Sequence, residues 1–366
     1  MKIECLVEKI KDSVSITERA TGKNLTLNVL SCVLLIASGK TLKIRATNLD
    51  LGVEIEIPAK IEKEGIVAIK GSTLNNFLSG IQNEKNVVLE VVNENILVTT
   101  KNNKTIIKCY PYNDFPTIPT ISTNTSFEIE AKTFNNGVKS VFYSAAVTEI
   151  KPEIASVYFY QNNNELVFVA TDSFRLAEKR IKTKTINDFN GIIIPFKNIT
   201  EIVKITENID GLITIKTTKN QLSISFNGVY ITSRLIDGVF PDYQQIIPKE
   251  KKTEVVVLKQ DLINAFKLSN TFLDKFNQVS FFVSPKTKQV KIKTKNQDVG
   301  ETDTNIEAAI SGEEVEVNFN YRYIFDCFQS ITQDSLILQF NGNSKPLIIK
   351  NVSDNSFLYL VMPMNR

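Results

Sequence analysis

Three stretches of the chain share one pattern of apolar and polar positions. In each, a β-rich run enters a short break of Thr, Asn, Asp or Lys, and a second extended run follows. The clearest is Val167–Lys179, VFVATDSFRLAEK, and the other two lie around Ala46 and Thr294, each 124 positions from Ala170. This period is too long for a solenoid unit and suits a domain of roughly 100–150 residues. The sequence therefore predicts one domain used three times.

Within each third of the chain, apolar spacing predicts two helices and about six to eight strands. The helices are expected at 6–19, 72–82, 132–146, 195–205, 258–272 and from 318 or 320 to 330, with Ser72 or Thr73 and Asn318 or Asn320 as candidate N-caps. Strands are expected at 30–36, 43–46, 52–57, 66–69, 87–92, 96–100, 104–110, 156–160, 165–170, 192–194, 212–217, 221–226, 229–235, 279–283, 290–294, 315–317, 336–340, 346–350 and 358–362. The pair Asn227-Gly228 predicts a hairpin turn.

Two proline-containing stretches, 111–125 and 238–248, read as linkers, so the expected domains are 1–121, 122–248 and 249–366. Strand-rich repeats with two helices each must bury one face of both helices on a sheet. The predicted fold class is therefore α+β, with two helices packed on antiparallel sheets in each repeat. If the three repeats lie side by side, the free faces of six helices line one surface.

The amino-acid composition excludes several classes of function. The 366 residues include 43 basic and 40 acidic side chains, a net charge of +3, so any contact with DNA must come from local arrangement rather than excess charge. Histidine is absent, which excludes Ser–His–Asp and Cys–His catalysis and histidine-ligated metals. The four cysteines have no CxxC spacing and are expected to be free thiols, so neither a metal nor another cofactor is expected. The charged N-terminus and the lack of a membrane-length apolar run predict a soluble, cytoplasmic protein.

Two alternatives remain open at this point. A metal-dependent nuclease or phosphoesterase could use the carboxylates of Asp172 and Asp242, but these two residues lie in separate motifs without paired spacing. A β-rich scaffold unrelated to DNA is the other alternative.

Three motifs carry a resemblance to a known family. They are ATDSFRLA (170–177), DGVFPDYQQIIP (237–248) and YLVMPM (359–364). With the threefold repeat and the length, the chain resembles the bacterial DNA polymerase III β subunit, the sliding clamp. The resemblance implies a non-catalytic processivity factor, a head-to-tail homodimer whose ring encircles duplex DNA. It also implies binding to the replicative polymerase α subunit, the clamp loader, other polymerases and repair proteins, and no membrane.

The resemblance further implies a hydrophobic peptide-binding cleft. Its residues here are Lys151, Ile154, Thr171, Ser173, Phe174, Arg175, Leu176, Pro241, Ile246, Pro346, Val361, Met362, Pro363 and Met364. The chain departs from the family pattern at Ser173-Phe174, where Gly-His is common, at Gln245, where Arg is frequent, and at Asn365-Arg366, where Arg-Leu is frequent. These departures put partner preference in doubt.

Two further residue sets follow from the resemblance. Basic residues on or beside the helices are expected to contact DNA: Lys11, Lys23, Lys132, Lys139, Lys197, Lys204 and Lys267. The dimer contact is expected to pair the last strand of the first domain with the third domain through Lys104, Ile107, Lys108, Leu268, Asp298, Glu301 and Asp303. Opposite charges there would fix a head-to-tail polarity.

Overall fold

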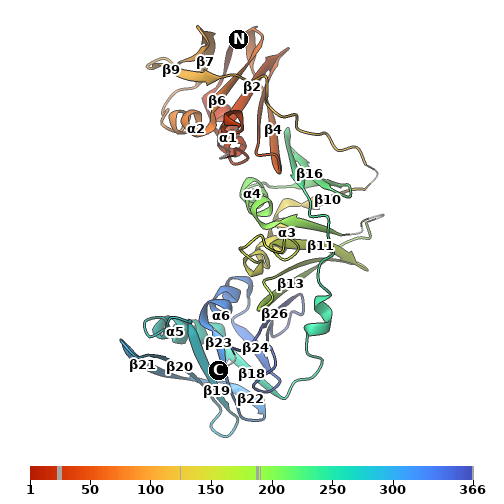
Figure 1. The fold of residues 1–366 in the computed structure, drawn as a ribbon, viewed down its shortest axis with the longest axis vertical. Helices are drawn as coiled ribbons and strands as arrows, with labels where there is room; N and C mark the ends of the chain where they lie inside the picture. Colours follow the sequence, from red (N-terminus) through yellow and green to blue (C-terminus); the bar gives the residue numbers. More distant parts are fainter. Residues whose placement is uncertain (23–26, 124, 187–188, 190, 365–366) are drawn as a thin grey trace. The chain divides into compact units, whose positions relative to one another are not determined.

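The computed structural model describes residues 1–22, 27–123, 125–186, 189 and 191–364. The chain separates into two compact units, Met1–Lys132 with Thr200–Leu235, and Thr133–Ile199 with Ile236–Arg366. Figure 1 shows the ribbon. The α-helices of the described residues are α1 (Val7–Glu18), α2 (Gly71–Ser79), α3 (Ala131–Lys139), α4 (Phe196–Thr206), α5 (Lys259–Asn270) and α6 (Tyr321–Cys327). They come in pairs, so each third of the chain holds two, as the sequence predicts.

The first unit is built on one continuous antiparallel sheet. In spatial order its strands are β10 (Ser126–Glu130), β15 (Leu212–Thr217), β16 (Gln221–Phe226), β17 (Val229–Arg234), β4 (Leu51–Pro58), β3 (Thr41–Thr47), β2 (Cys32–Ser38), β6 (Gly65–Lys70), β9 (Lys104–Tyr110), β8 (Asn95–Thr99), β7 (Asn86–Val92), β1 (Lys2–Leu6) and β5 (Lys60–Lys63). The sheet thus joins strands from two repeats through the β17–β4 pair.

The second unit contains two sheets. The larger runs β14 (Ile192–Pro195), β11 (Ser156–Asn162), β12 (Glu165–Thr171), β13 (Arg175–Lys182), β26 (Phe357–Val361), β25 (Leu347–Asn351), β24 (Ser335–Phe340), β18 (Thr253–Leu258) and β22 (Ala309–Gly312). The smaller runs β21 (Gly300–Glu307), β20 (Gln289–Asn296), β19 (Gln278–Ser284) and β23 (Val315–Asn320). The β13–β26 pair joins two repeats in the same way as β17–β4.

The repeat predicted from the sequence is confirmed by strand register. The three hairpins β3–β4, β12–β13 and β20–β21 pair Ala46 with Val53, Ala170 with Ala177, and Thr294 with Thr302. The 124-residue period therefore superposes equivalent hairpins.

The turns of the first two hairpins are built alike. The hydroxyl of Thr47 donates to the carbonyl oxygen of Leu51 over 2.9 Å, and that of Thr171 donates to Arg175 over 2.7 Å. Asn48 and Asp172 each accept two turn amides on a side-chain oxygen. The next residue in each turn, Leu49 or Ser173, has a positive φ of 82° or 78°. A shared polar code thus produces one turn geometry twice.

Helix α3 lies unusually close to the sheet of its unit. A Cβ added to Gly137 would lie 2.4 Å from the Cε2 atom of Phe168 on β12. One turn earlier, the ring of Phe134 makes edge contacts with Phe159 and Phe168 at centroid separations of 6.1 Å. The lack of a side chain at Gly137 lets the helix backbone rest on the aromatic ring.

Several expected boundaries are wrong. The helix expected at 132–146 ends at Lys139, and a short 3-10 helix, Phe142–Ser144, follows. Neither Ser72 nor Thr73 caps α2, because Gly71 already begins that helix. The strand expected from 30 begins at Cys32, after the 3-10 helix Asn28–Ser31. The other candidate cap is confirmed, since the side chain of Asn320 accepts from the amides of Arg322 and Tyr323 at the start of α6.

The strand that opens each repeat was not predicted. These strands are β1, β10 and β18, and each runs directly into the first helix of its repeat. In β1 the sequence KIECL alternates, with Ile3 and Cys5 buried and the charged Lys2 and Glu4 at the alternate positions. Five residues of alternation next to a helix give a weak signal, because the two periodicities overlap at the boundary.

Candidate partner-binding surface

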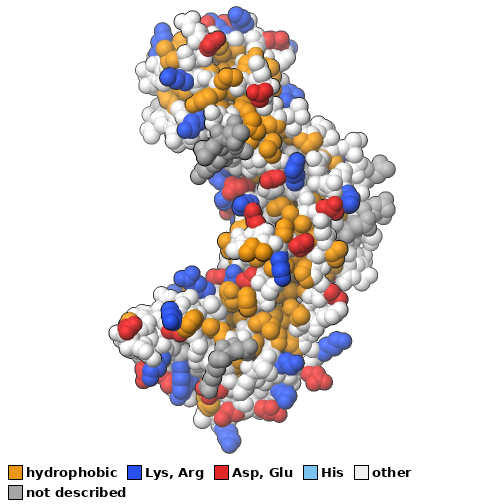
Figure 2. All heavy atoms as spheres, in the orientation of Figure 1, with side chains coloured by type: hydrophobic (Ala, Val, Ile, Leu, Met, Phe, Trp, Pro, Cys, Tyr) orange, Lys and Arg blue, Asp and Glu red, His pale blue; other side chains and the backbone are white. Residues whose placement is uncertain are grey.

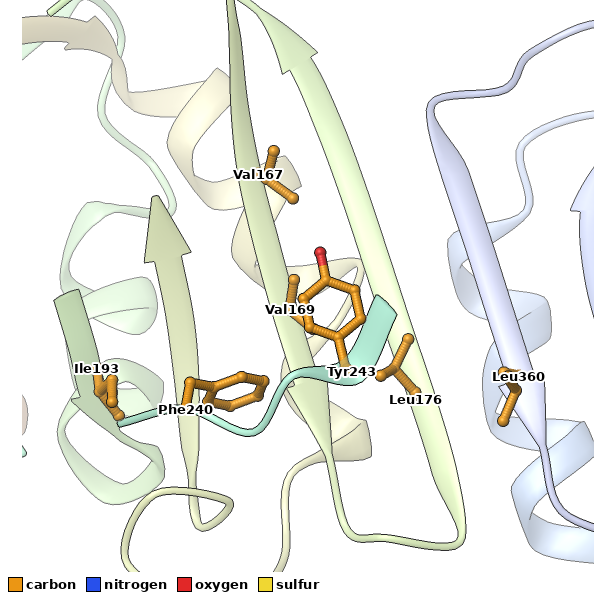
Figure 3. Packing of buried hydrophobic residues seen from close by; sticks show 7 residues of the cluster. All are labelled: Val167, Val169, Leu176, Ile193, Phe240, Tyr243 and Leu360. Carbon is orange, nitrogen blue, oxygen red and sulfur yellow. The ribbon is translucent and has the colours of Figure 1, made fainter. Parts of the chain in front are cut away.

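A hydrophobic cluster underlies the junction of β12, β13 and β26. Figure 3 shows its members: Val167 and Val169 on β12, Leu176 on β13, Ile193 on β14, Phe240 and Tyr243 on the 238–248 segment, and Leu360 on β26. All seven are buried, and Met362 packs against them with part of its surface exposed. The cluster draws three separated motifs of the sequence into one place.

Backbone pairing fixes the edge of this junction. Arg175 pairs with Val361 and Leu176 with Leu360 across β13 and β26. The ladder then continues past the strands, because the amide of Met362 donates to the carbonyl oxygen of Phe174 over 2.8 Å. The Phe174 side chain remains 60% exposed. An aromatic ring in water next to a half-buried methionine is an apolar surface that a partner can cover.

Arg175 is a structural residue at this junction. Its side chain is buried, donates to Asp172 over 3.0 Å and to Asp326 over 2.6 Å, and stacks 4.6 Å from the centre of the Tyr323 ring. Burial by itself lowers the pKa of Arg175, but Tyr359, Asp326 and Asp172 outweigh burial and raise it. The guanidinium therefore stays charged and locks the 171–175 turn to helix α6.

The 238–248 segment is held by a buried polar group. The hydroxyl of Tyr243 hydrogen-bonds to the carboxylate of Glu178 and lies 2.7 Å from the hydroxyl of Tyr160. Burial, followed by the charge of Glu178, raises the pKa of Tyr243, so the phenol stays protonated. At the start of the segment, a Cβ on Gly238 would lie 2.9 Å from the Cγ atom of Glu153, which places the 151–154 turn beside it.

The fourteen predicted cleft residues all belong to the second unit and differ in their exposure. Those exposed to solvent are Lys151, Ser173, Phe174, Pro241 and Ile246. Those half-buried are Ile154, Met362, Pro363 and Met364. Those buried as support are Thr171, Arg175, Leu176, Pro346 and Val361. Of the positions where the chain departs from the family pattern, Asn365-Arg366 lies outside the described residues.

Sequence reasoning missed several residues at the junction. Tyr243 and the 88% exposed Val239 stand inside the quoted motif DGVFPDYQQIIP, so the motif itself was a signal. Tyr323 and Asp326, which hold Arg175, gave no signal, because only folding brings α6 to this turn.

The helix lysines lie among carboxylates. Lys132 is 2.7 Å from Asp210, Lys197 is 2.6 Å from Glu149, and Lys204 is 2.6 Å from Glu201. Lys11 donates to the carbonyl oxygen of Ser79, Lys139 is half-buried, Lys267 is exposed, and Lys23 lies outside the described residues. Figure 2 shows basic and acidic side chains interspersed on the visible face. The helices thus carry a balanced rather than a strongly positive surface.

The predicted dimer residues are mostly exposed. Lys104, Lys108, Leu268, Asp298, Glu301 and Asp303 all face solvent. Ile107 does not, since it is 7% exposed and turned toward its own repeat, whereas the adjacent Ile106 is 71% exposed. Glu301 also has a cross-strand partner, Lys295, at 3.1 Å. The solvent-exposed isoleucine of β9 is therefore Ile106, not the predicted Ile107.

The carboxylates proposed for a nuclease have structural partners. Asp172 accepts from two turn amides and from Arg175, and Asp242 accepts from Gln245 over 2.6 Å. Over the described part of the chain, no group of three or more acidic or cysteine side chains is placed to hold a metal ion. No helix in that part is long and apolar enough to cross a membrane.

Comparison with known proteins agrees with this architecture. Three family models match in order: the N-terminal domain of the DNA polymerase III beta subunit over residues 1–119, its central domain over 128–242 and its C-terminal domain over 244–365. The beta sliding clamp of Synechococcus elongatus is 24% identical over 371 residues, which cover 100% of this chain and 99% of the relative.

Solved structures give the same result. The DNA polymerase III beta subunit of Thermotoga maritima matches with a TM-score of 0.94 and 24% identity, covering 100% of this chain and 99% of that one. The sliding clamp of Bartonella birtlesii, in a structure bound to griselimycin, matches with a TM-score of 0.94 and 26% identity over 100% of both chains.

Three copies of one helix-and-sheet unit, joined edge to edge by strand pairing, define the DNA-clamp class of proteins. Within that class, the chain belongs to the DNA polymerase III beta subunit family, the bacterial sliding clamps. Its function is that of a processivity clamp, with DNA and a polymerase as partners. The nuclease hypothesis has no support from these matches.

Proposed function

We propose that this chain forms a head-to-tail homodimer whose ring encircles duplex DNA, with repeats bounded at 1–121, 122–248 and 249–366. The repeat itself supports the dimer. In the first two repeats the hairpin strands β4 and β13 are each completed by a strand of the following repeat, β17 and β26. The equivalent strand of the third repeat, β21, lies at the edge of its sheet in the described structure.

Strand β9 is the equivalent of β17 and β26. Its pairing with β6 involves Cys109 and Tyr110, so residues 104–108 are the part of β9 that can pair with β21 of a second chain. Starting four residues before the first helix of each repeat, the ladders run Ile3–Leu89–Val98–Thr105, Phe127–Ile215–Ile224–Ile231 and Val255–Leu338–Ile349–Tyr359. Ile231 then pairs with Val53, and Tyr359 pairs with Ala177. Since Thr302 is the equivalent of Val53 and Ala177, the repeat predicts that Thr105 pairs with Thr302 of the second chain.

This register gives the dimer contact its chemistry. Counting along antiparallel strands, Lys104 falls opposite Asp303 of the second chain, and Ile106 falls opposite Glu301. A cross-strand pair of opposite charge favours the pairing by roughly 0.2–1 kcal/mol. The exposed Ile106 would be covered on association, which contributes up to about 1.5–3 kcal/mol.

Sliding on DNA is consistent with the charge pattern. Each phosphate neutralised by a lysine steepens the salt dependence of binding by about 0.9 log units per log of salt. Lys132, Lys197 and Lys204 are already near carboxylates, so their attraction to phosphates is moderate. A topologically linked ring needs few strong contacts. We propose these lysines, with Lys11, Lys139 and Lys267, as weak, sequence-independent DNA contacts.

The junction around Phe174 and Met362 is the proposed site for partners such as the polymerase α subunit, the clamp loader, other polymerases and repair proteins. The observation that supports it is the exposed ring of Phe174 next to the half-buried Met362. The backbone amide of Met362 donates a hydrogen bond to the carbonyl oxygen of Phe174. Two or three apolar anchors of a partner peptide, less the ordering of the peptide, give a dissociation constant near the micromolar range. We further propose that the protein has no catalytic activity and acts in the cytoplasm.

The test is loading by a cognate clamp loader and ATP on nicked circular DNA, followed by linearisation. We expect retention on circles and release from the linear form, because a ring slides off a free end. Equal retention on both forms would mean ordinary electrostatic binding and would overturn the ring.

A further inference from the structure

A pocket lies where the first hairpin turn meets strands of the second repeat. Its volume is about 220 Å³, and its walls are the turn at 47–52, the segment 116–119, and the strand positions 221 and 232–234. All of these belong to the first compact unit. The Phe174–Met362 junction, by contrast, belongs to the second unit.

Register identifies this pocket as the counterpart of that junction. Gly52 pairs with Thr232 as Leu176 pairs with Leu360. The amide of Arg234 donates to the carbonyl oxygen of Asp50 over 2.8 Å, as Met362 donates to Phe174 over the same distance. The two turns share their hydrogen bonds and their positive φ residue. The same backbone site thus occurs in two successive repeats.

The side chains at the two positions differ in kind. Asp50 stands where the junction has Phe174, Gly52 where it has Leu176, and Arg234 where it has Met362. The guanidinium of Arg234 lies 3.9 Å from the carboxylate of Asp50, and about two-thirds of each side chain is exposed. An apolar side chain that fits the junction would contact the charged groups of Asp50 and Arg234 in this pocket. The pocket therefore favours a polar ligand.

The floor of the pocket holds a hydroxyl without a partner. Thr232 is 5% exposed, and a Cβ on Gly52 would lie 2.9 Å from its Oγ1 atom. No residue among those described hydrogen-bonds to that hydroxyl. Because the Oγ1 atom of Thr232 is open to the cavity, a ligand that brings a hydrogen-bonding group to it replaces a contact with solvent.

We propose that this pocket binds the side-chain carboxamide of a glutamine or asparagine in an extended peptide of a partner protein. A carboxamide carries two donors and an acceptor, so it can donate to Asp50 and accept from Thr232 or Arg234 without burying a charge. The volume is below that of drug-sized sites and fits one side chain. The far wall is fixed, because Tyr230 donates to the carbonyl oxygen of Pro119 over 3.2 Å. The proposal adds a second docking position to the proposed function.

The experiment is methyl NMR on the full-length dimer with labelled Ile, Thr and Met, titrated with acetyl-glutamine N-methylamide. We expect the methyl signals of Ile118 and Thr232 to shift, with a dissociation constant near the millimolar range. In Thr232→Val the hydroxyl is replaced by a methyl of equal size, and the affinity read at Ile118 should fall at least fivefold. Thr214→Val, on β15 outside the pocket, should leave it unchanged.

Two results would overturn the proposal. One is no shift at Ile118, or a shift that Thr232→Val does not weaken. The other is a shift of equal size with the acetyl-leucine analogue, because the pocket would then not select a carboxamide. Met362 and Met364 report the other junction in the same spectra. A failure of the pocket proposal can therefore be distinguished from a failure of the proposed partner surface or of the proposed DNA loading.

Discussion

The backbone amide of Met362 donates to the carbonyl oxygen of Phe174 over 2.8 Å and so joins the second and third repeats at the point where an aromatic ring faces solvent. The same bond occurs one repeat earlier between Arg234 and Asp50. One backbone geometry therefore carries an apolar surface in one place and a polar pocket in the other. Different side chains at equivalent positions therefore give the two places different surface chemistry.

Replacing Phe174 by alanine should weaken partner peptides. The ring is 60% exposed, so its loss removes contact area from the complex with little effect on folding. We expect the dissociation constant of a polymerase α peptide, measured by fluorescence polarisation, to rise about 10-fold, the equivalent of about 1.4 kcal/mol.

Phe276→Ala is the matched control for that variant. Phe276 is 58% exposed, follows α5 in the third repeat and is not part of the cluster under the junction. Equal affinity losses in the two variants would remove Phe174 from the partner surface.

A designed disulfide tests the predicted dimer register. If Thr105 pairs with Thr302 of a second chain, their Cα atoms are within the 4.4–6.8 Å range that a disulfide spans. We expect the double variant Thr105→Cys, Thr302→Cys to give a covalent dimer on mild oxidation, read by non-reducing electrophoresis. Thr105→Cys with Thr304→Cys moves the second thiol by two positions and should crosslink far less. Preferential crosslinking of this offset pair would show that the register is wrong.

The edge of β9 and the acids of β21 should control dimer strength. Ile106→Lys puts a charge at the 71% exposed position expected to be covered, and we expect the dimer dissociation constant to rise about 10- to 100-fold in analytical ultracentrifugation. Reversing Glu301 and Asp303 to lysine should also weaken the dimer, because Asp303 falls opposite Lys104. Ile66→Lys, at a 40% exposed position on β6, is the control. An unchanged constant in the β9 and β21 variants would contradict the proposed interface.

Gly137→Ala should destabilise the second repeat. The added Cβ would lie 2.4 Å from the Phe168 ring, and that ring is fully buried, so helix α3 must move away from the sheet. Overpacking of this kind reduces the free energy of unfolding by about 1–3 kcal/mol. The urea concentration at the midpoint of unfolding measures this loss of stability. Gly80→Ala, whose new Cβ meets nothing closer than 3.4 Å, should change the midpoint little. Equal midpoints for both variants would mean that the contact at Gly137 relaxes freely.

Thiol reactivity should depend steeply on pH. Burial raises the pKa of Cys5 to about 12 and that of Cys109 to about 11. Since the thiolate is the nucleophile, alkylation by iodoacetamide at pH 8 should be about 100-fold slower at Cys109 and about 1000-fold slower at Cys5 than at a free thiol, and should rise about 10-fold per pH unit up to pH 10. Cys109, which is only half-buried, should react first in peptide mapping.

The same shifts bear on stability. A raised pKa means that the folded state keeps a proton that the unfolded chain releases near pH 8.5. This stabilisation is complete below about pH 8.5 and is lost as the pH rises toward 11–12. Replacing Cys5 by alanine should make the urea midpoint depend less on pH above about pH 8.5. A free-thiol reaction rate at pH 8 in the folded protein would contradict the assigned burial.

Local sequence determined the repeat and the hairpin turns. Thr47 and Asn48, or Thr171 and Asp172, supply side-chain oxygens that close a turn within five residues, so the pattern is readable without any tertiary contact. The same holds for the cap at Asn320 and for the Asn227-Gly228 turn, where both residues have positive φ. Boundaries such as the end of α3 were less readable, since apolar spacing alone does not stop a helix.

Tertiary structure decided what each of these positions can do. Alternation along β9 leaves open which of Ile106 and Ile107 faces outward, because a shift of one residue reverses every side chain, and only packing on β8 resolves it. The sequence alone does not show that Arg175 is a buried structural residue. Its partners Asp326 and Tyr323 lie on α6, and Asp326 is 151 residues further along the chain. Three copies of one fold could be predicted from the chain alone, because local hydrogen bonds and apolar periodicity act over a few residues. Which copy exposes Phe174 and which buries Thr232 in a pocket depended on strands brought together from distant parts of the chain.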